Sequence, residues 1–162
     1  MKTIVVVDKN WGIGKKNDLL FRLKKDMAFF RQTTTGKVIV MGANTFLSFP
    51  NGALPNRVNI VLDDKGRKFD GTTTVASLDE LAAVLQNFDT DNVYVVGGAG
   101  VYKQLLSWCD TAYVTKVDAD GGAEVFFPDL DEMPNWQLAD MSQPVEDNGY
   151  MLSFCTYVCK KS

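Results

Sequence analysis

Short runs of β-branched residues alternate with helical segments through most of the chain, and this alternation constrains the fold more than any other feature. The runs predict strands at residues 3–7, 37–41, 57–62, 72–76, 93–96 and 111–117. Helices are expected between them, at residues 23–33, just after Gly42, at 77–88 and at 100–109. Because strands that alternate with helices are joined by crossover connections, the pattern predicts an open, mainly parallel α/β sheet with helices on both faces.

The last part of the chain is expected to add an antiparallel hairpin. Two strand-like segments, "WQLADM" and "GYMLSFCTYV", follow residue 135 and are joined through Pro144 without a helix between them. We therefore expect a mixed sheet of about eight strands, with this hairpin at its edge. The 162 residues, of which 46% are hydrophobic, suit one domain that spans residues 1–162.

The composition disfavours several kinds of function. The chain has 17 Lys and Arg against 20 Asp and Glu, a net charge of −3, which argues against broad binding to nucleic acid phosphates. It has 3 cysteines and no histidine, so neither a metal site nor a histidine-activated nucleophile is expected. No apolar run is long enough for a signal peptide or a membrane span, and we expect a soluble, cytoplasmic protein.

One carboxylate is unusually placed in the first predicted helix. At about 100° per residue, Asp26 falls within the apolar arc of that helix. The arc consists of Leu23, Met27, Phe29 and Phe30. One interpretation is an acid paired with Arg22 at the helix start. The other is a carboxylate at a pocket wall, where burial raises its pKa into a range useful for proton transfer.

Two strand-to-helix junctions are rich in glycine. Gly42 follows one strand, and Gly97, Gly98 and Gly100 follow another. Glycine lets a phosphate approach the backbone closely, and the N–H groups at a helix start attract it. The second junction is G-G-x-G and lacks the G-x-G-x-x-G spacing, so either junction alone fits a tight turn equally well. Two of them in one sheet, beside a lone pocket acid, favour a dinucleotide cofactor and hydride transfer.

The segment from Asp8 to Phe21 is a long connection between the first strand and the helix of Asp26. A floppy surface loop is one interpretation. Trp11 and Ile13, however, are apolar residues that are unfavourable to expose. We therefore favour a lid over the edge of the sheet, because long loops in compact domains often cover binding sites.

The chain contains, in this order, the segments "DKNWGIGKKNDLLF", "LKKDMAFFRQTT", "GKVIVMGANTF", "LPNRVNIVL", "VYVVGGAGVYKQLL" and "YVTKVDA". Together with "EVFFPDLDE" and the C-terminal hairpin they cover nearly the whole chain. In order and spacing these segments resemble dihydrofolate reductase. The resemblance implies NADPH-dependent reduction of 7,8-dihydrofolate to 5,6,7,8-tetrahydrofolate by hydride transfer, in support of one-carbon metabolism and of thymidylate and purine synthesis. It also implies a monomer that binds antifolate inhibitors.

The resemblance further implies roles for individual residues. The implied catalytic residues are Asp26 at the pterin, Thr115 supporting its carboxylate, and Phe21 in place of a frequent tryptophan. The implied substrate-binding residues are Val5, Val6, Asp26, Met27, Phe30, Phe49, Leu54, Arg57, Val96 and Thr115, with Arg57 on the glutamate α-carboxylate. The implied cofactor-binding residues are Val7, Ile13, Gly14, Gly42, Ala43, Asn44, Thr45, Leu62, Asp63, Val96, Gly97, Gly98, Ala99, Gly100, Val101 and Tyr102. The family also joins the glycines that match Gly97 and Gly98 by a cis peptide.

The chain departs from the family where the adenosine phosphate of NADPH is expected. Two positions that are often basic hold Ala43 and Gly100, and Asp63 and Asp64 stand where a hydroxyl is frequent. Positive charge is expected instead from three residues just beyond, namely Lys65, Arg67 and Lys68. NADPH is still expected to be favoured over NADH, by a narrower margin than with both arginines.

Two other functions fit parts of the pattern. A pyrimidine reductase of the riboflavin pathway shares this fold in looser form, but would not need both Asp26 and the downstream "LPNR" at residues 54–57. A catalytically silent nucleotide- or folate-binding protein would not need a buried acid. Asp26 is the residue that discriminates among the three hypotheses.

Overall fold

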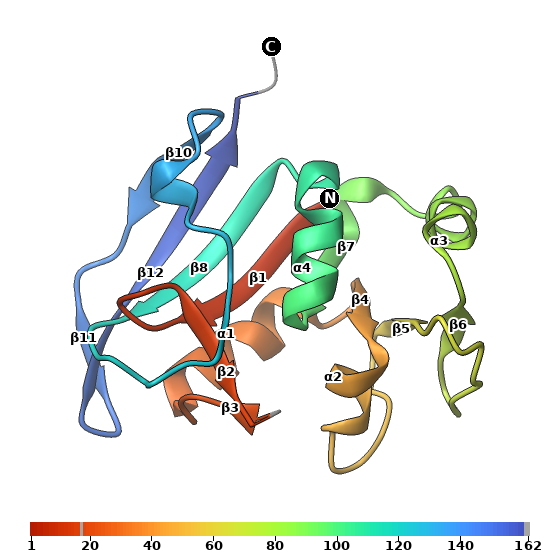
Figure 1. Ribbon diagram of the computed structural model, residues 1–162, viewed down its shortest axis with the longest axis horizontal. Helices are drawn as coiled ribbons and strands as arrows, with labels where there is room; N and C mark the ends of the chain where they lie inside the picture. The colour runs from red at the N-terminus through yellow and green to blue at the C-terminus, as the bar shows by residue number, and fades with distance from the viewer. Residues whose placement is uncertain (17, 161–162) are drawn as a thin grey trace.

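A central sheet runs through the molecule in the computed structural model, which describes residues 1–16 and 18–160 (Figure 1). The strand order is β10-β12-β8-β1-β7-β4-β5-β6, and β11 pairs with β12. The parallel strands are β1 (Lys2–Val7), β4 (Val38–Gly42), β5 (Val58–Leu62), β6 (Thr73–Val75), β7 (Val93–Gly97) and β8 (Thr111–Val117). The antiparallel strands are β10 (Trp136–Met141), β11 (Val145–Asp147) and β12 (Tyr150–Cys159). The expected mixed sheet with its C-terminal hairpin is confirmed.

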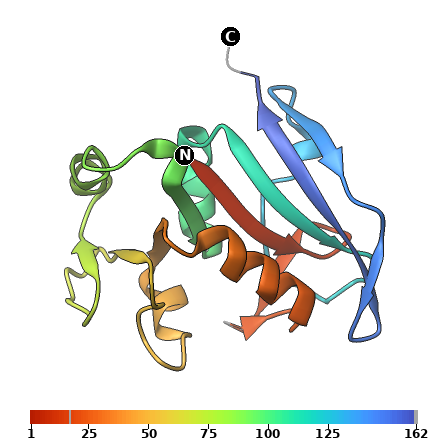
Figure 2. The ribbon, with the colours of Figure 1, turned by 180° about the vertical axis from the view of Figure 1, so that it is seen from behind.

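Helices cover both faces of the sheet, as Figures 1 and 2 show from opposite sides. The helix α1 (Lys24–Thr34) lies on one face and α4 (Ala99–Leu105) on the other, while α2 (Ala43–Leu47) and α3 (Leu78–Leu85) follow β4 and β6. Short 3₁₀ turns are η1 (Thr90–Asn92), η2 (Leu106–Trp108) and η3 (Leu130–Glu132). This double cover explains why Ile39, Met41 and Ile60 are completely buried and why the strands are almost continuously apolar. In the described part of the chain, no helix has the length and apolar character to span a membrane.

The carboxyl ends of four parallel strands lie in one row. Met41 of β4 is paired with Gly97 of β7, Gly42 with Leu62 of β5, and Leu62 with Val75 of β6. In open α/β sheets, ligands bind in the crevice outside this edge. The two glycine junctions and the residues after β5 therefore lie along the same edge of the sheet.

The side chains of β1 divide between the two faces of the sheet. Val5 and Val7 belong to the core cluster that also contains Val101 and Tyr102 of α4. Ile4 belongs to the opposite cluster, against which Phe29 and Phe30 of α1 pack, and Val6 packs against a third cluster around Phe21 and Leu23. Alternation along a strand accounts for this division.

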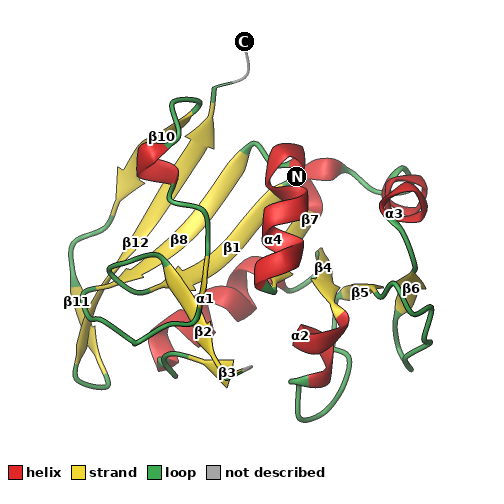
Figure 3. Ribbon diagram, viewed as in Figure 1, coloured by secondary structure: helices red, strands yellow, loops and turns green. Residues whose placement is uncertain are grey.

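The described residues between Asp8 and Phe21 contribute two strands to a second, small sheet (Figure 3). Its strands are β2 (Gly12–Lys15) and β3 (Asp18–Leu19), and β2 also pairs with β9 (Val125–Phe126). The buried ring of Trp11 stacks on Phe127 at a centroid distance of 6.2 Å. The interpretation as a floppy loop is therefore wrong, and the role as a lid stays a prediction.

Candidate active site

The centre of the candidate site is the carboxylate of Asp26 in the first turn of α1. Its hydrogen-bond donor is the hydroxyl of Thr115, a fully buried residue of β8. Burial is the largest influence on Asp26 and raises the pKa of its carboxyl group. The hydrogen bond from Thr115 lowers the pKa, and the negative charge of Asp147 raises it again. The result is a carboxyl group that takes up a proton more readily than an exposed aspartate.

Tyr102 fixes the backbone next to this carboxylate. Its hydroxyl donates a hydrogen bond of 2.7 Å to the carbonyl oxygen of Ile4 in β1. Burial, and secondarily the charge of Asp26, raises the pKa of Tyr102, so this hydroxyl stays protonated. Sequence reasoning assigned Tyr102 to the cofactor and did not include Ile4. The run of valines after Ile4 gives no alternation from which the face of each residue could be read.

The predicted substrate residues are only partly brought together. Phe30, Phe49, Leu54 and Val96 all pack against the core cluster that contains Ile4. Val5 lies on the opposite face, beneath α4, together with Val7 and Ile13, which were predicted to bind the cofactor. Met27, expected in the apolar arc, has 59% of its surface exposed. Phe21 is buried, with its ring against Tyr150 at a centroid distance of 4.9 Å.

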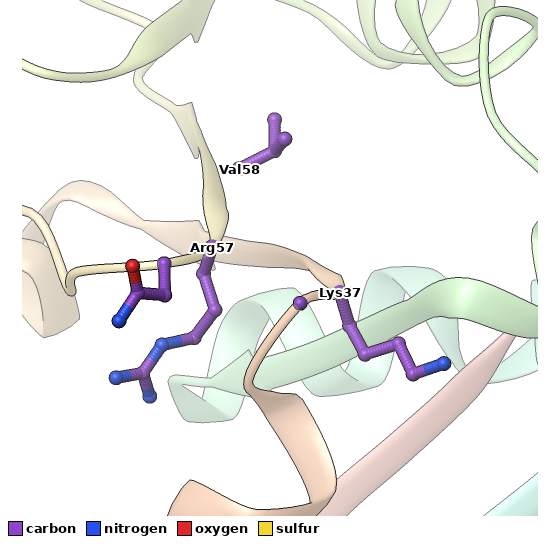
Figure 4. Close-up of a pocket in the computed structure, with 5 residues that line it drawn as sticks. Lys37, Arg57 and Val58 are labelled. Atoms are coloured by element: carbon purple, nitrogen blue, oxygen red, sulfur yellow. The ribbon is translucent and has the colours of Figure 1, made fainter.

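Arg57 lies at the far end of α1, beside a shallow hollow of about 280 Å³ (Figure 4). The hollow is lined by Gly36, Lys37, Asn56, Arg57 and Val58. The guanidinium of Arg57 donates to the carbonyl oxygen of Pro55 at 2.9 Å and to the hydroxyl of Thr34 at 3.2 Å. Burial, and then the positive charge of Arg31, lowers the pKa of Arg57. Two cations so placed favour the binding of an anion.

Lys37 does not join this cationic pair. In Figure 4 its side chain and that of Arg57 point in different directions. The ammonium group of Lys37 instead donates to the side-chain oxygen of Asn92 at 3.1 Å. Lys37 is therefore a useful comparison for Arg57.

At the two junctions, neighbouring side chains come so close to the backbone that there is little room for a Cβ atom. A Cβ atom on Gly97 or Gly98 would lie 3.3 Å from the hydroxyl oxygen of Thr45 at the start of α2. A Cβ on Gly42 would lie 3.0 Å from a methyl carbon of Val101. A cis peptide bond joins Gly97 to Gly98, in agreement with the resemblance. The glycines of each junction thus pack closely against a side chain that follows the other junction: Thr45 lies against Gly97 and Gly98, and Val101 lies against Gly42.

Asp63, the residue after β5, neutralises Arg67, one of the three expected cations. Its buried carboxylate accepts a bond of 2.8 Å from Nε and one of 3.3 Å from Nη2 of Arg67. It also accepts the backbone N–H groups of Lys65 and Arg67. The hydrogen bonds from Arg67 hold the pKa of Asp63 below its usual value. The expectation that Arg67 supplies free positive charge is therefore wrong, because Arg67 is paired with Asp63 four residues earlier in the same turn.

The candidate lid is fastened to the chain after β8. The buried carboxylate of Asp8 accepts backbone N–H groups from Asn10, Gly12 and Gly121 at 2.7–2.9 Å. Further along, the carboxylate of Glu124 accepts the N–H of Lys16 at 2.7 Å. Sequence reasoning did not single out Asp8 or Glu124, although an acid that ends a strand and precedes Asn and Gly is a common turn former.

Comparison with known proteins decides the family. The family model described as "Dihydrofolate reductase" matches residues 1–159. The chain belongs to the dihydrofolate reductase family. It is 36% identical to dihydrofolate reductase of Bacillus subtilis (strain 168), over 98% of this chain and 94% of the relative. It is 32% identical to that of Neisseria gonorrhoeae, over 97% of this chain and 96% of the relative.

A solved structure agrees along the whole chain. The dihydrofolate reductase from Enterococcus faecalis, complexed with NADP(H) and RAB-propyl, superposes with a TM-score of 0.87 and 28% sequence identity. The match covers 99% of this chain and 96% of that one. The chain is therefore an enzyme of the dihydrofolate reductase family, an oxidoreductase. These matches favour that family over the pyrimidine reductase that the sequence pattern also allowed.

The bond between Thr115 and Asp26 can be tested directly. Thr115→Val keeps the shape of the side chain and removes the donor, so the pKa of Asp26 should rise further, by about 0.5–1 pH unit. Titration of the Asp26 carboxyl carbon by NMR measures this shift. Thr111→Val on the same strand, whose hydroxyl bonds Asp110, is the matched control. An unchanged titration in Thr115→Val would show that Thr115 does not stabilise the carboxylate.

Proposed function

We propose that the chain reduces 7,8-dihydrofolate to 5,6,7,8-tetrahydrofolate with NADPH. The observation that carries this proposal is the partly buried Asp26, held by Thr115 against an apolar wall at the ligand-binding edge of a dihydrofolate reductase fold. The Enterococcus faecalis relative, in complex with NADP(H), supports the choice of cofactor.

Asp26 orients the pterin and supports its protonation. An apolar wall strengthens the hydrogen bonds that a carboxylate accepts, because water competes less there. The 2-amino group and ring N3 of the pterin offer two donors along one edge, which match the two oxygens of Asp26. Thr115 restricts the orientation of the carboxylate. The raised pKa of Asp26 favours proton uptake at the site, and this supports protonation at N5. Phe21 lies in the apolar cluster beside the start of α1, and its ring has no N–H to hold a water molecule.

The rest of the substrate would extend along α1 towards Arg57. The helix has 11 residues, so its axis spans about 16 Å from the first turn to the last. Phe30, Phe49 and Leu54 supply apolar surface between the two ends. The glutamate α-carboxylate of the substrate would bind the Arg57 guanidinium, next to the second positive charge of Arg31.

The cofactor would lie along the carboxyl edge of the sheet. Gly42, Gly97 and Gly98 have no side chains that would keep a ligand from the backbone at the two junctions, and the row of strand ends continues to Leu62, which Asp63 follows. NADPH, when bound, supplies the hydride. Gly42, Gly97 and Gly98, together with Asn44 and Thr45, would hold the pyrophosphate, and the residues after β5 would hold the adenosine end.

Replacing the carboxylate tests the proposed reaction. The wild type should reduce dihydrofolate, followed by the loss of NADPH absorbance. Asp26→Asn should be slower by about 100-fold or more near neutral pH. The defect should shrink as the pH falls, because substrate that is already protonated needs less help. Asp79→Asn, an exposed acid in the first turn of α3, is the control. A wild type without activity would favour a silent binding protein, and an active Asp26→Asn would remove Asp26 from the mechanism.

Arg57 should contribute mainly to binding. Its proposed contact is far from the reacting carbon, so Arg57→Ala should raise KM for dihydrofolate about 10- to 100-fold and change kcat much less. Lys37→Ala, from the same hollow, should leave KM close to that of the wild type. Steady-state kinetics of both variants measure the difference. Equal KM values for the two variants would show that the glutamate does not bind Arg57.

The preference for NADPH over NADH should be modest and sensitive to salt. Asp63 neutralises Arg67, so the net positive charge near the adenosine ribose comes from Lys65 and Lys68 against Asp64. Ala43→Arg should tighten NADPH binding and leave NADH nearly unchanged, whereas Arg67→Ala should weaken NADPH binding, because it leaves the negative charge of Asp63 without its partner. Dissociation constants of both cofactors at low and high ionic strength measure this. An equal gain for both cofactors in Ala43→Arg would show that this position does not face the 2′-phosphate.

A further inference from the structure

The helix that carries Asp26 begins without a cap of its own. Its N-cap residue, Leu23, has no side chain that can accept a hydrogen bond. The first N–H groups of a helix need such an acceptor. It is supplied by Asp147, whose carboxylate accepts the N–H of Lys25 at 2.7 Å from 122 residues further along the chain. A residue of β11 therefore takes the place of the missing cap.

The turn between β11 and β12 is fastened to the same helix start by other contacts. The ammonium group of Lys25 donates to the carbonyl oxygen of Glu146 at 2.7 Å. The side-chain amide of Asn148 lies 3.5 Å from the carbonyl oxygen of Arg22. Figure 2 shows this turn beside the first turn of α1. The position of Asp147 is thus determined by several contacts and not by one flexible side chain.

Asp147 brings a second negative charge to the neighbourhood of Asp26. The N–H group that it accepts belongs to the residue immediately before Asp26. From the other elements packed here, β8 contributes the uncharged Thr115 and α4 contributes Tyr102, which stays protonated. On α1 itself, the Lys25 ammonium is directed to Glu146. Asp147 raises the pKa of Asp26, in the same direction as burial.

We propose that Asp147 is a positioning residue of the active site, which caps the helix that carries Asp26 and by its charge biases the site towards proton uptake. This inference rests on the proposed role of Asp26 in the reduction of dihydrofolate. It assigns part of the proton chemistry to a hairpin at the opposite end of the sequence.

The two effects of Asp147 can be separated by two substitutions. Asp147→Asn keeps an oxygen that accepts the N–H of Lys25 but removes the charge. Asp147→Ala removes both. Glu146→Gln is the matched control, because it removes a neighbouring charge on the same strand whereas the Glu146 contact with Lys25 uses the backbone carbonyl.

The experiment combines three measurements on the full chain. NMR titration of the Asp26 carboxyl carbon should show a pKa lower by about 0.3–1 unit in both Asp147 variants and unchanged in Glu146→Gln. The pH profile of hydride transfer should shift downwards by the same amount, with a rate loss of about two- to tenfold near neutral pH. Thermal unfolding should separate the variants, because only Asp147→Ala should lose about 2–4 °C in Tm.

The outcomes distinguish this inference from the proposed function. If the Asp26 titration in Asp147→Asn equals that of the wild type, the inference is overturned, and Asp147 is a helix cap alone. If both variants shift the titration but Asp147→Ala keeps the wild-type Tm, the capping part is overturned. The titration needs no turnover, so a wild type that fails to reduce dihydrofolate would refute the proposed function and leave this measurement valid.

Discussion

The hydrogen bond from Thr115 to Asp26 joins the helix on one face of the sheet to a central strand, and the candidate site is arranged around it. A carboxylate that is partly removed from water is unfavourable unless it is hydrogen-bonded. The fully buried Thr115 provides one donor and leaves the remaining acceptor capacity of Asp26 for a ligand. The apolar side chains around Asp26 strengthen each such hydrogen bond, because water competes less there. Tyr102 holds the neighbouring strand β1 in place through its hydrogen bond to the carbonyl oxygen of Ile4.

The backbone of this fold is largely readable from the sequence, whereas the orientation of many side chains is not. All six parallel strands, the C-terminal hairpin and four helices follow from apolar periodicity, because each buries a continuous surface. The strands β2, β3, β9 and β11 were not predicted, since each is only two to four residues long and forms by pairing with a neighbouring strand. In β1, the run of consecutive valines does not indicate which side chains lie on the same face of the sheet as Asp26. The structure assigns that face to Ile4 and Val6.

The pairing of charged side chains in the candidate site was also not predictable from the sequence. Counting residues suggested three free cations after β5, but the geometry of one tight turn pairs Arg67 with Asp63. Asp147 reaches the helix of Asp26 from 122 residues away, a relation that no local pattern contains. The sequence identified the central acid because a carboxylate in an apolar arc is itself a local anomaly. The groups that adjust this acid come from β8, α4 and β11, and only the folded chain brings them together.

The contacts of Asp8 and Glu124 divide the candidate lid into two parts that are held with different strength. One buried carboxylate accepts backbone N–H groups from two different loops, so neither loop can withdraw without removing at least one of its three donors. The contact between Glu124 and Lys16, by contrast, is exposed, and water can replace it with little loss. If the segment is a lid, as predicted, its base at Asp8 would stay fixed and its contact at Lys16 would be released first. Such a lid would bend at residues after Gly12, and the stacking of Trp11 on Phe127 would be kept when it opens.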